Sequence, residues 1–256
     1  MRVSEQLAYV LHHYSYRETS LLLEIFARDY GRLGILAKGA RRARPRARMP
    51  LEPFQRLLMG WSGKGDLPVL TGVDLDGDPI FLSGEALYCG FYMNELLFRL
   101  LHRHDPHEAL FAAYQSSLQA LQGGDIAEAT LRIFEKRLLQ EVGYGLVLDT
   151  EINSDVPIEP GRMYEYLPMH GPVRATDRKE ITTEQSVSIS GDSLIALARE
   201  TLTEQRALRE SKSLMRVVLG LYLGSKPLNS RKLFHDLKQI PIIETDTEAL
   251  IDPARR

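Results

Sequence analysis

The chain has 256 residues, of which 44% are hydrophobic and 26% charged, a composition that excludes a disordered tail and predicts one large or two small domains with an ordinary core. The formal net charge is −2, so whole-chain charge indicates neither a nucleic acid nor a membrane partner. The single cysteine, Cys89, excludes an intramolecular disulfide and a cysteine-rich zinc site. We expect no signal peptide at Met1–Tyr16, no transmembrane helix, and a location in the reducing cytoplasm.

Residues 1–80 alternate apolar and polar residues in short runs that are rich in β-formers. These runs predict five strands, at Leu7–Tyr16, Thr19–Ala27, Arg32–Ala37, Phe54–Trp61 and Val69–Val73. Turn residues such as Asp29, Tyr30 and Gly31 separate them. Because closing a sheet removes its exposed edges, five short strands predict a small closed barrel of SH3-like or OB-like type. Strand spacing alone leaves both types open.

Positive charge is concentrated between the third and fourth predicted strands. Residues 1–80 contain 12 basic and 9 acidic side chains, whereas residues 81–256 contain 20 and 25. Six basic side chains lie in one proline-interrupted run without an acid, the basic loop: Lys38, Arg41, Arg42, Arg44, Arg46 and Arg48. Arginine offers both forked phosphate contacts and flat stacking surfaces. With Arg32 on the adjacent strand, the basic loop predicts salt-dependent binding of nucleic acid.

Aromatic residues near the basic loop offer stacking surfaces for bases if they face the same groove. The candidates are Tyr14, Tyr16, Phe26, Tyr30 and Trp61. Each of these aromatic residues taken alone is more typical of a barrel core. For the basic loop, the alternative interpretation is a solvated surface loop that binds nothing.

After Pro79 the apolar pattern takes the helical period. Ser83 can cap a helix whose apolar stripe runs from Cys89 to Leu101. Further helices are predicted at Pro106–Leu121, Asp125–Val142, Asp192–Glu200, Arg206–Leu223 and Asn229–Lys238. The proline-rich stretch at 144–190 predicts an irregular insertion, with a small hairpin at Met163–Met169 and Val173–Thr176. We therefore expect a barrel domain at 1–80 and a mostly α-helical domain at 81–256.

No motif for catalysis or for a metal site is complete. Asp74, Asp76 and Asp78 alternate like the start of a calcium loop, but position 83 is serine where the loop needs glutamate. Among His102, His104 and His107 only the last two share a helix face, and no acid or cysteine completes a zinc set. We therefore predict no catalytic residue, no metal site and no cofactor, and interpret the Asp cluster as a turn at Asp76 and Gly77.

Six stretches occur in a recognisable order: Glu18–Leu23, Gly31–Arg32 with Leu36–Arg41, Leu51–Phe54, Leu87–Leu97, Leu131–Phe134 with Gly143–Gly145, and Leu223–Arg231. In their order and spacing they resemble the bacterial recombination mediator family RecO. The resemblance covers nearly the whole chain. It implies a multi-domain α+β fold, in which an N-terminal OB-fold barrel is followed by a mostly α-helical domain.

The resemblance also implies a function and partners. Members of this family bind single- and double-stranded DNA, anneal complementary strands, and help the recombinase RecA replace single-strand binding protein, so RecA is an indirect partner. The implied direct partners are RecR and the acidic C-terminal tail of single-strand binding protein, in the nucleoid region of the cytoplasm. Some members have a four-cysteine zinc module, which a chain with only Cys89 cannot form, so this chain resembles the zinc-free branch.

A tail of acidic residues ending in phenylalanine needs an apolar pocket beside a cation. The predicted helix Asp125–Val142 places Arg132 and Lys136 four residues apart, with Leu139 three residues beyond. The family resemblance implies that the tail binds in this domain. Because the stretch Leu131–Phe134 matches the family, the resemblance implies that Arg132 is a tail-binding residue. The alternative is that both cations pair with Glu128 and Glu135 on a solvated helix.

Two other functions remain open at this point. An OB-type RNA-binding or ribosome-associated factor would have the same charge pattern. A metal-dependent nuclease using Asp74–Asp78 is a third possibility.

Overall fold

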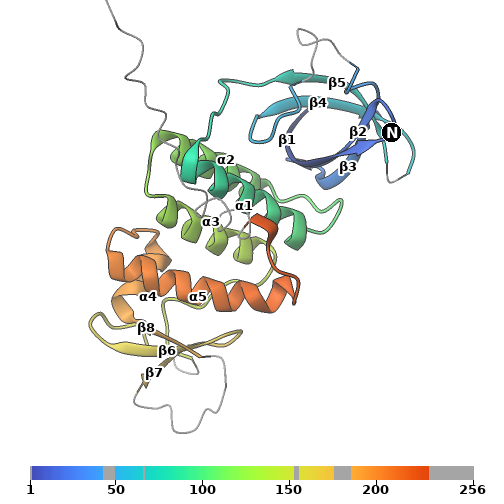
Figure 1. Ribbon diagram of the computed structural model, residues 1–256. Coiled ribbons are helices and arrows are strands. Elements are labelled where there is room, and N and C mark those ends of the chain that lie inside the picture. Colours follow the sequence, from blue (N-terminus) through green and yellow to red (C-terminus); the bar gives the residue numbers. More distant parts are fainter. Residues whose placement is uncertain (1, 43–49, 66, 153–155, 176–185, 231–256) are drawn as a thin grey trace, which may run out of the picture.

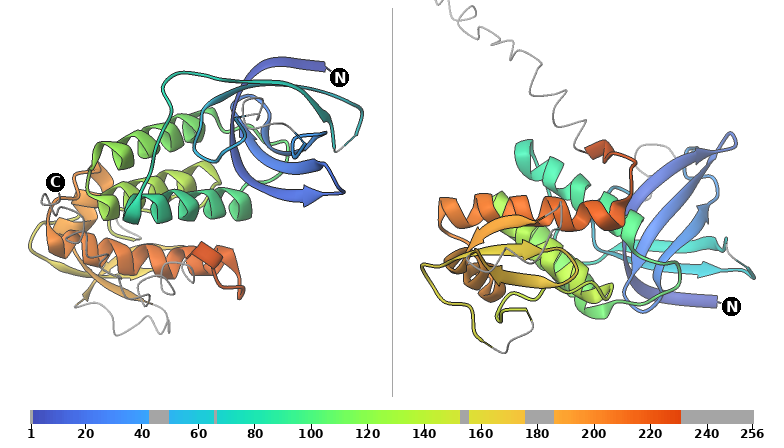
Figure 2. Two further views of the ribbon diagram at one scale, coloured as in Figure 1. Left: turned by 45° about the horizontal axis from the view of Figure 1, so that its top comes forward. Right: turned by 90° about the horizontal axis from the view of Figure 1, so that it is seen from below.

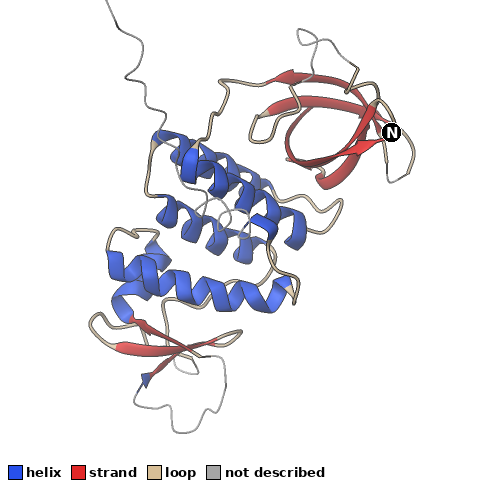
Figure 3. Ribbon diagram, viewed as in Figure 1, coloured by secondary structure: helices blue, strands red, loops and turns tan. Residues whose placement is uncertain are grey.

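The computed structural model describes residues 2–42, 50–65, 67–152, 156–175 and 186–230. A barrel of strands lies at one end of the molecule, α-helices fill the middle, and a small sheet lies at the other end (Figures 1 and 2). Strands and helices are segregated along the chain (Figure 3), which confirms the predicted α+β fold class. No helix in the described ranges is long and apolar enough to cross a membrane.

The barrel consists of β1 (Arg2–Tyr16), β2 (Ser20–Ala27), β3 (Gly31–Ala37), β4 (Leu57–Ser62) and β5 (Val69–Leu75). It closes in the order β1-β2-β3-β5-β4. The β3–β5 pair is parallel, with the Leu36 N–H donating to the Pro68 carbonyl at 2.9 Å, and the other neighbours are antiparallel. This five-stranded closed order identifies the OB-fold and excludes the SH3-like alternative.

The barrel strands have an inner and an outer face, because side chains alternate along a strand. Leu23, Ile25 and Ile35 are completely buried with Trp61 in the interior. The cross-strand pairs Leu22–Leu36 and Glu24–Gly34 belong to the opposite, outer face of β2 and β3. Leu36 on this outer face lines a hollow together with Tyr16 and Ser20.

The middle of the molecule contains α1 (Gly84–Leu100), α2 (Glu108–Gly123) and α3 (Ala127–Glu141), followed later by α4 (Gly191–Arg199) and α5 (Gln205–Leu223). The apolar stripe predicted from Cys89 onward is the buried face of α1. Ser83 occupies the N-cap position of α1, but its side chain makes no capping hydrogen bond.

The interior of the barrel is an apolar cluster of its own, but residues on the outer face of the barrel belong to the hydrophobic core of the helices. Tyr9 packs edge-on against Tyr114 of α2 with ring centroids 4.9 Å apart, and Phe26 packs against Phe111 at 5.4 Å. The Asn94 amide of α1 donates to the Leu11 carbonyl of β1 at 3.0 Å. These contacts attach the outer face of the barrel directly to α1 and α2.

Gly31 allows the β2–β3 hairpin to approach the loop after α1. Its φ is +66°, and a Cβ at this position would lie 2.1 Å from the Asp105 carbonyl oxygen. The next residue, Arg32, accepts a hydrogen bond at its carbonyl from the His104 N–H at 3.0 Å. Only glycine combines this backbone conformation with this close approach.

The predicted irregular insertion contains a three-stranded sheet. Its strands are β6 (Met163–Leu167), β7 (Gly171–Arg174) and β8 (Val187–Ser190), in the order β7-β6-β8. The hairpin prediction is therefore correct, and β8 is an additional strand. Buried Tyr164, Tyr166 and Ile189 attach the sheet to the helical core by apolar packing.

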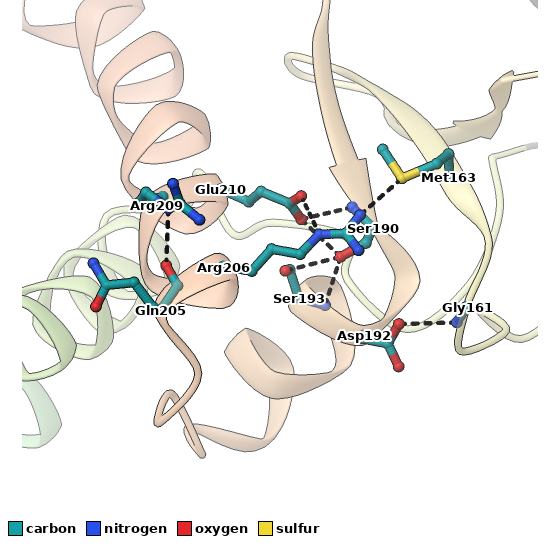
Figure 4. A network of polar contacts seen from close by, with 9 residues as sticks. All are labelled: Gly161, Met163, Ser190, Asp192, Ser193, Gln205, Arg206, Arg209 and Glu210. Carbon is teal, nitrogen blue, oxygen red and sulfur yellow. Dashed lines mark hydrogen bonds and ion pairs between the residues drawn. The ribbon is translucent and has the colours of Figure 1, made fainter.

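A polar network joins β8 to α4 and α5 (Figure 4). The Ser190 hydroxyl caps α4 by accepting from the Ser193 N–H at 3.3 Å. The Glu210 carboxylate of α5 accepts from the Ser190 N–H at 2.8 Å, from its hydroxyl at 2.7 Å, and from Arg206 at 2.8 Å. One carboxylate thus holds a strand end and a helix start together.

Two predicted strand boundaries differ from the structure, and one predicted helix lies mostly outside the described residues. Strand β1 begins at Arg2 rather than Leu7, because Val3 pairs with Trp61 of β4. Phe54 precedes β4 and is buried, with its ring 5.1 Å from that of Phe91 on α1. The helix predicted at Asn229–Lys238 is described only for 229–230, and its remainder lies outside the described residues.

Candidate nucleic-acid interface

A hollow of about 550 Å³ opens on the barrel where the β1–β2 turn meets the end of β3. We call it the basic hollow, and its lining residues are Tyr16, Arg17, Glu18, Thr19, Ser20, Leu36, Lys38, Gly39 and Arg42. Strand register places these residues together, since Tyr16 pairs with Ser20 and Leu21 pairs with Ala37. Three cations and one acid therefore surround the hollow, which favours an anionic ligand.

The start of the basic loop is attached to the β1–β2 turn. The Arg41 N–H donates to the Thr19 carbonyl at 3.0 Å, and the Arg41 guanidinium donates to the Arg17 carbonyl at 3.2 Å. The Arg17 guanidinium lies over the Tyr16 ring at 5.4 Å. Lys38, Arg41 and Arg42 are exposed. The first half of the predicted basic run thus forms one surface with the turn.

Sequence reasoning missed Arg17. It stands between Tyr16 and Glu18, twenty residues before the basic loop, and nothing local distinguishes it. Only the register of three strands brings it beside Lys38 and Arg42. The predicted contacts Arg44, Arg46 and Arg48 lie outside the described residues.

The structure places Arg32 away from the basic hollow. Its guanidinium donates to the Glu24 carboxylate at 3.0 Å and to the Leu101 carbonyl at 3.0 Å, and lies 5.1 Å from the Phe98 ring. Arg103 also pairs with Glu24, which is buried. The guanidinium of Arg32 is therefore engaged between the barrel and α1, and Arg32 does not line the basic hollow.

The five candidate aromatic residues separate into three groups. Phe26 and Trp61 are buried in the core, and Tyr30 packs against Trp61 with ring centroids 5.3 Å apart. Tyr16 borders the basic hollow, and Tyr14 is 44% exposed. Only Tyr14 and Tyr16 of β1 are thus placed to stack on bases.

A second pocket, of about 360 Å³, lies among α1, α3 and α5. We call it the helical pocket, and its lining residues are Glu85, Tyr88, Cys89, Tyr92, Glu128, Leu131, Arg132, Lys212, Arg216 and Ser230. Apolar and aromatic side chains thus lie beside three cations and two acids. The Lys212 ammonium pairs with Glu128. This combination suits a ligand with an aromatic ring and a carboxylate.

Arg132 reaches the helical pocket, whereas the other two predicted tail residues do not. The Lys136 ammonium donates to the Ala198 carbonyl at 3.0 Å and pairs with Glu200 at 2.8 Å, so it closes the C-terminal end of α4. Leu139 is completely buried in the core. Of the three predicted residues, only Arg132 therefore lines the helical pocket, because the Lys136 ammonium contacts α4 and Leu139 packs in the core.

The floor of the helical pocket is a buried polar group. Arg132 pairs with Glu135 at 2.8 Å, and the Tyr92 hydroxyl donates to the same carboxylate at 2.5 Å. Both Arg132 and Glu135 are buried, so the geometry of the guanidinium is fixed. Burial, together with Glu85, raises the pKa of the Cys89 thiol to about 11, which keeps it protonated and unreactive at neutral pH.

The clusters considered for metal binding are dispersed. Asp76 pairs with Arg56 at 2.5 Å, in the turn that the sequence predicts with Gly77. His107 is the N-cap residue of α2 and lies 3.3 Å from Asp105. Within the described ranges, no three acidic, histidine or cysteine side chains are close enough to hold a metal ion.

Comparisons with known proteins identify the family. A family model described as Recombination protein O N terminal matches residues 1–76, and one described as Recombination protein O C terminal matches residues 82–232. The chain belongs to the RecO family. The DNA repair protein RecO of Nitrosococcus oceani is 45% identical over 240 residues, covering 94% of this chain and 96% of that protein. The DNA repair protein RecO of Dechloromonas aromatica is 45% identical over 242 residues, covering 93% and 98%.

Membership of the RecO family assigns the chain to DNA repair and recombination. The two RecO family models meet between residues 76 and 82, where β5 has ended and α1 has not begun. The family boundary thus coincides with the change from strand to helix. Each of the two hollows falls mainly within one of the two matched regions.

Proposed function

We propose that this chain binds single- and double-stranded DNA at the basic hollow and anneals complementary strands during repair. The observation that carries the proposal is the convergence of Arg17, Lys38 and Arg42 on one exposed hollow of an OB-fold barrel. OB-folds bind oligonucleotides on the face of strands 2 and 3 and at the β1–β2 loop, and the basic hollow lies at that loop.

Annealing requires no covalent chemistry. Basic side chains reduce the phosphate repulsion between two approaching strands, and stacking surfaces hold bases unpaired until partners meet. Arg41 and Arg42 supply charge, and the Tyr16 ring supplies an adjacent surface. The sequence of the basic loop also contains Arg44, Arg46 and Arg48, whose charges the proposal includes.

The helical pocket supports a second part of the proposal, a site for the C-terminal tail of single-strand binding protein. Arg132, Lys212 and Arg216 would bind acidic groups, and the apolar wall formed with Leu131 would accept a terminal phenylalanine ring. The chain would then act with RecR to help RecA replace single-strand binding protein. These partners come from the family resemblance.

DNA binding can be tested by the salt dependence of affinity. If about five phosphates are contacted, affinity for single-stranded DNA falls by roughly two decades between about 50 and 200 mM salt. Replacing Arg17, Arg41 and Arg42 by alanine removes about three contacts, so the slope of log affinity against log salt decreases by about two. Fluorescence anisotropy with a labelled oligonucleotide measures both quantities, and a strand-annealing assay measures the activity.

The matched control removes three exposed arginines at the opposite end of the molecule, Arg162, Arg199 and Arg209. It leaves the slope unchanged if the hollow is the site. An unchanged slope in the folded Arg17, Arg41 and Arg42 variant would contradict the proposal. Equal affinity for RNA and DNA would favour an RNA-binding factor instead, and magnesium-dependent cleavage would favour a nuclease.

A further inference from the structure

A third hollow, of about 510 Å³, lies between strand β1 of the barrel and the helices. We call it the interdomain cleft, and its lining residues are Leu11, His12, Tyr14, Phe91, Asn94, Glu95, Phe98, Arg99, Lys226, Asn229 and Ser230. Three sequence regions therefore form it: the second half of β1, one face of α1, and the segment after α5. Neither Arg132 nor the described part of the basic loop lines it.

The outer face of β1 connects the interdomain cleft with the basic hollow. His12, Tyr14 and Tyr16 alternate along β1, so their side chains share one face. The His12 and Tyr14 rings are in edge contact with centroids 4.3 Å apart. Tyr14 lines the cleft and Tyr16 lines the hollow. The two hollows therefore lie next to each other along the outer face of β1.

The cleft walls are aromatic. Phe91 and Phe98 come from α1, where they are half-buried, and Tyr14 faces them from β1 with 44% of its surface exposed. Burial and the neighbouring His13 lower the pKa of His12, so its ring is neutral at neutral pH and adds a flat surface. Aromatic rings around an exposed cleft suit nucleobases, because every base has a π-face.

The carboxylate of Glu95 in the cleft already accepts hydrogen bonds from the protein, whereas the ammonium group of Lys226 lies exposed at the edge of the cleft. The Glu95 carboxylate accepts from the Asn229 N–H at 2.9 Å and from the Ser230 N–H at 2.8 Å, and lies 3.9 Å from Arg99. Arg99 in turn donates to the Lys226 carbonyl at 2.8 Å. The exposed Lys226 side chain contributes a positive charge beside the aromatic walls.

We propose that the interdomain cleft is a second nucleotide-binding subsite for single-stranded DNA. A strand that leaves the basic hollow follows the outer face of β1 over Tyr16, a base stacks on Tyr14 in the cleft, and Lys226 binds a phosphate. The inference rests on the proposed function of the basic hollow, and extends it from the barrel to the junction with α1.

The test measures the affinity of the full chain for oligo-dT of increasing length. A short oligomer fills only the basic hollow, and affinity rises in a further step when the oligomer reaches the cleft. Tyr14→Ala removes that step, so that long oligomers bind about tenfold more weakly while short ones bind as before. Tyr14→Phe keeps the ring and the step. Lys226→Ala is expected to weaken the binding of long oligomers and to reduce the salt dependence of their affinity.

Tyr144→Ala is the matched control, because Tyr144 is also 44% exposed but does not line the cleft. Thermal melting establishes that each variant is folded. Photocrosslinking with 5-iodouracil in the long oligomer is expected to label the peptide that contains Tyr14. Unchanged binding of long oligomers by Tyr14→Ala would overturn the subsite while leaving the basic hollow intact. Failure of the unmodified chain to bind any oligomer would overturn the proposed function itself.

Discussion

The arginines of this chain have different roles that depend on the strand or helix face they occupy. Arg17 and Arg42 reach the basic hollow, whereas Arg32 pairs with buried Glu24 between barrel and helices. Arg132 pairs with Glu135 beneath the helical pocket. Ion pairs hold the side chains of Arg32 and Arg132 in place, whereas the exposed side chains of Arg17 and Arg42 are available to phosphates. Charge alone therefore does not indicate function.

At the helical pocket, Arg216→Glu is expected to weaken binding of a tail peptide from single-strand binding protein by about tenfold or more. Arg216 is exposed on the pocket, so its reversal repels acidic groups without disturbing the core. Arg132→Ala is also expected to weaken binding of the peptide. This substitution removes the cation that pairs with buried Glu135, so it also costs about 3–5 kcal/mol of stability. Isothermal titration calorimetry gives the affinities.

Lys136→Ala is the control for that experiment. Its ammonium contacts α4 rather than the pocket, so peptide affinity stays at the original value although stability falls. Loss of peptide binding in this variant, with Arg216→Glu unaffected, would place the tail site at the face first predicted from sequence.

At the scale of elements, periodicity predicts most helices and strands. The five barrel strands and the apolar stripe of α1 follow from alternation and from three- and four-residue spacing. Strand β8 could not be predicted, because four residues carry too little pattern and its partner β6 lies twenty residues earlier. Likewise the basic loop is visible in sequence, but Arg17 joins it only through strand register. Long-range pairing is the information that a local pattern lacks.

The corner of β8, α4 and α5 predicts a pH dependence of stability. Burial raises the pKa of Glu210, but hydrogen bonds from Arg206 and Ser190 outweigh it and lower the pKa to about 2. A carboxyl group whose pKa is lower in the folded than in the unfolded chain stabilises the fold at pH values above its ordinary pKa of 4.5. For Glu210 this contribution is lost as the pH falls from 4.5 to about 2. Because Arg206 is exposed, we expect about 1–2 kcal/mol.

Glu210→Gln is therefore expected to lower the free energy of unfolding at neutral pH and to have a smaller effect near pH 3. Urea unfolding followed by circular dichroism at several pH values measures this difference. Asp192, whose carboxylate accepts from the Gly161 N–H at 2.9 Å in the same region, provides Asp192→Asn as a comparison. A deficit in Glu210→Gln that is the same at every pH would show that its ionisation contributes nothing.

On the scale of the whole molecule, the three proposed sites follow one another from the barrel to the helices. The basic hollow lies on the barrel, the interdomain cleft lies at the junction, and the helical pocket lies among the helices. Ser230 borders both the cleft and the helical pocket. DNA and a protein tail could therefore be held at once, with the segment after α5 between them.

This continuity also predicts how the molecule unfolds. Tyr9 and Phe26 of the barrel pack in the same apolar cluster as the helices, so separating the two parts would expose this shared surface, although the barrel interior around Trp61 forms a cluster of its own. We expect one cooperative transition in urea. The only tryptophan, Trp61, is buried in the barrel and reports the barrel by fluorescence, whereas circular dichroism reports mainly the helices. The two transitions should coincide.

Phe111→Ala tests the coupling, because Phe111 of α2 contacts the rings of both Tyr9 and Phe26. Removing the ring is expected to cost about 3–5 kcal/mol. Since the lost contacts cross from α2 to the barrel, the fluorescence and dichroism midpoints should both move to lower urea, by similar amounts. Leu194→Ala, in α4 and away from the junction, should likewise move both midpoints if the barrel and the helices unfold as one unit. A shift of the dichroism midpoint alone would show that the barrel unfolds independently of the helices.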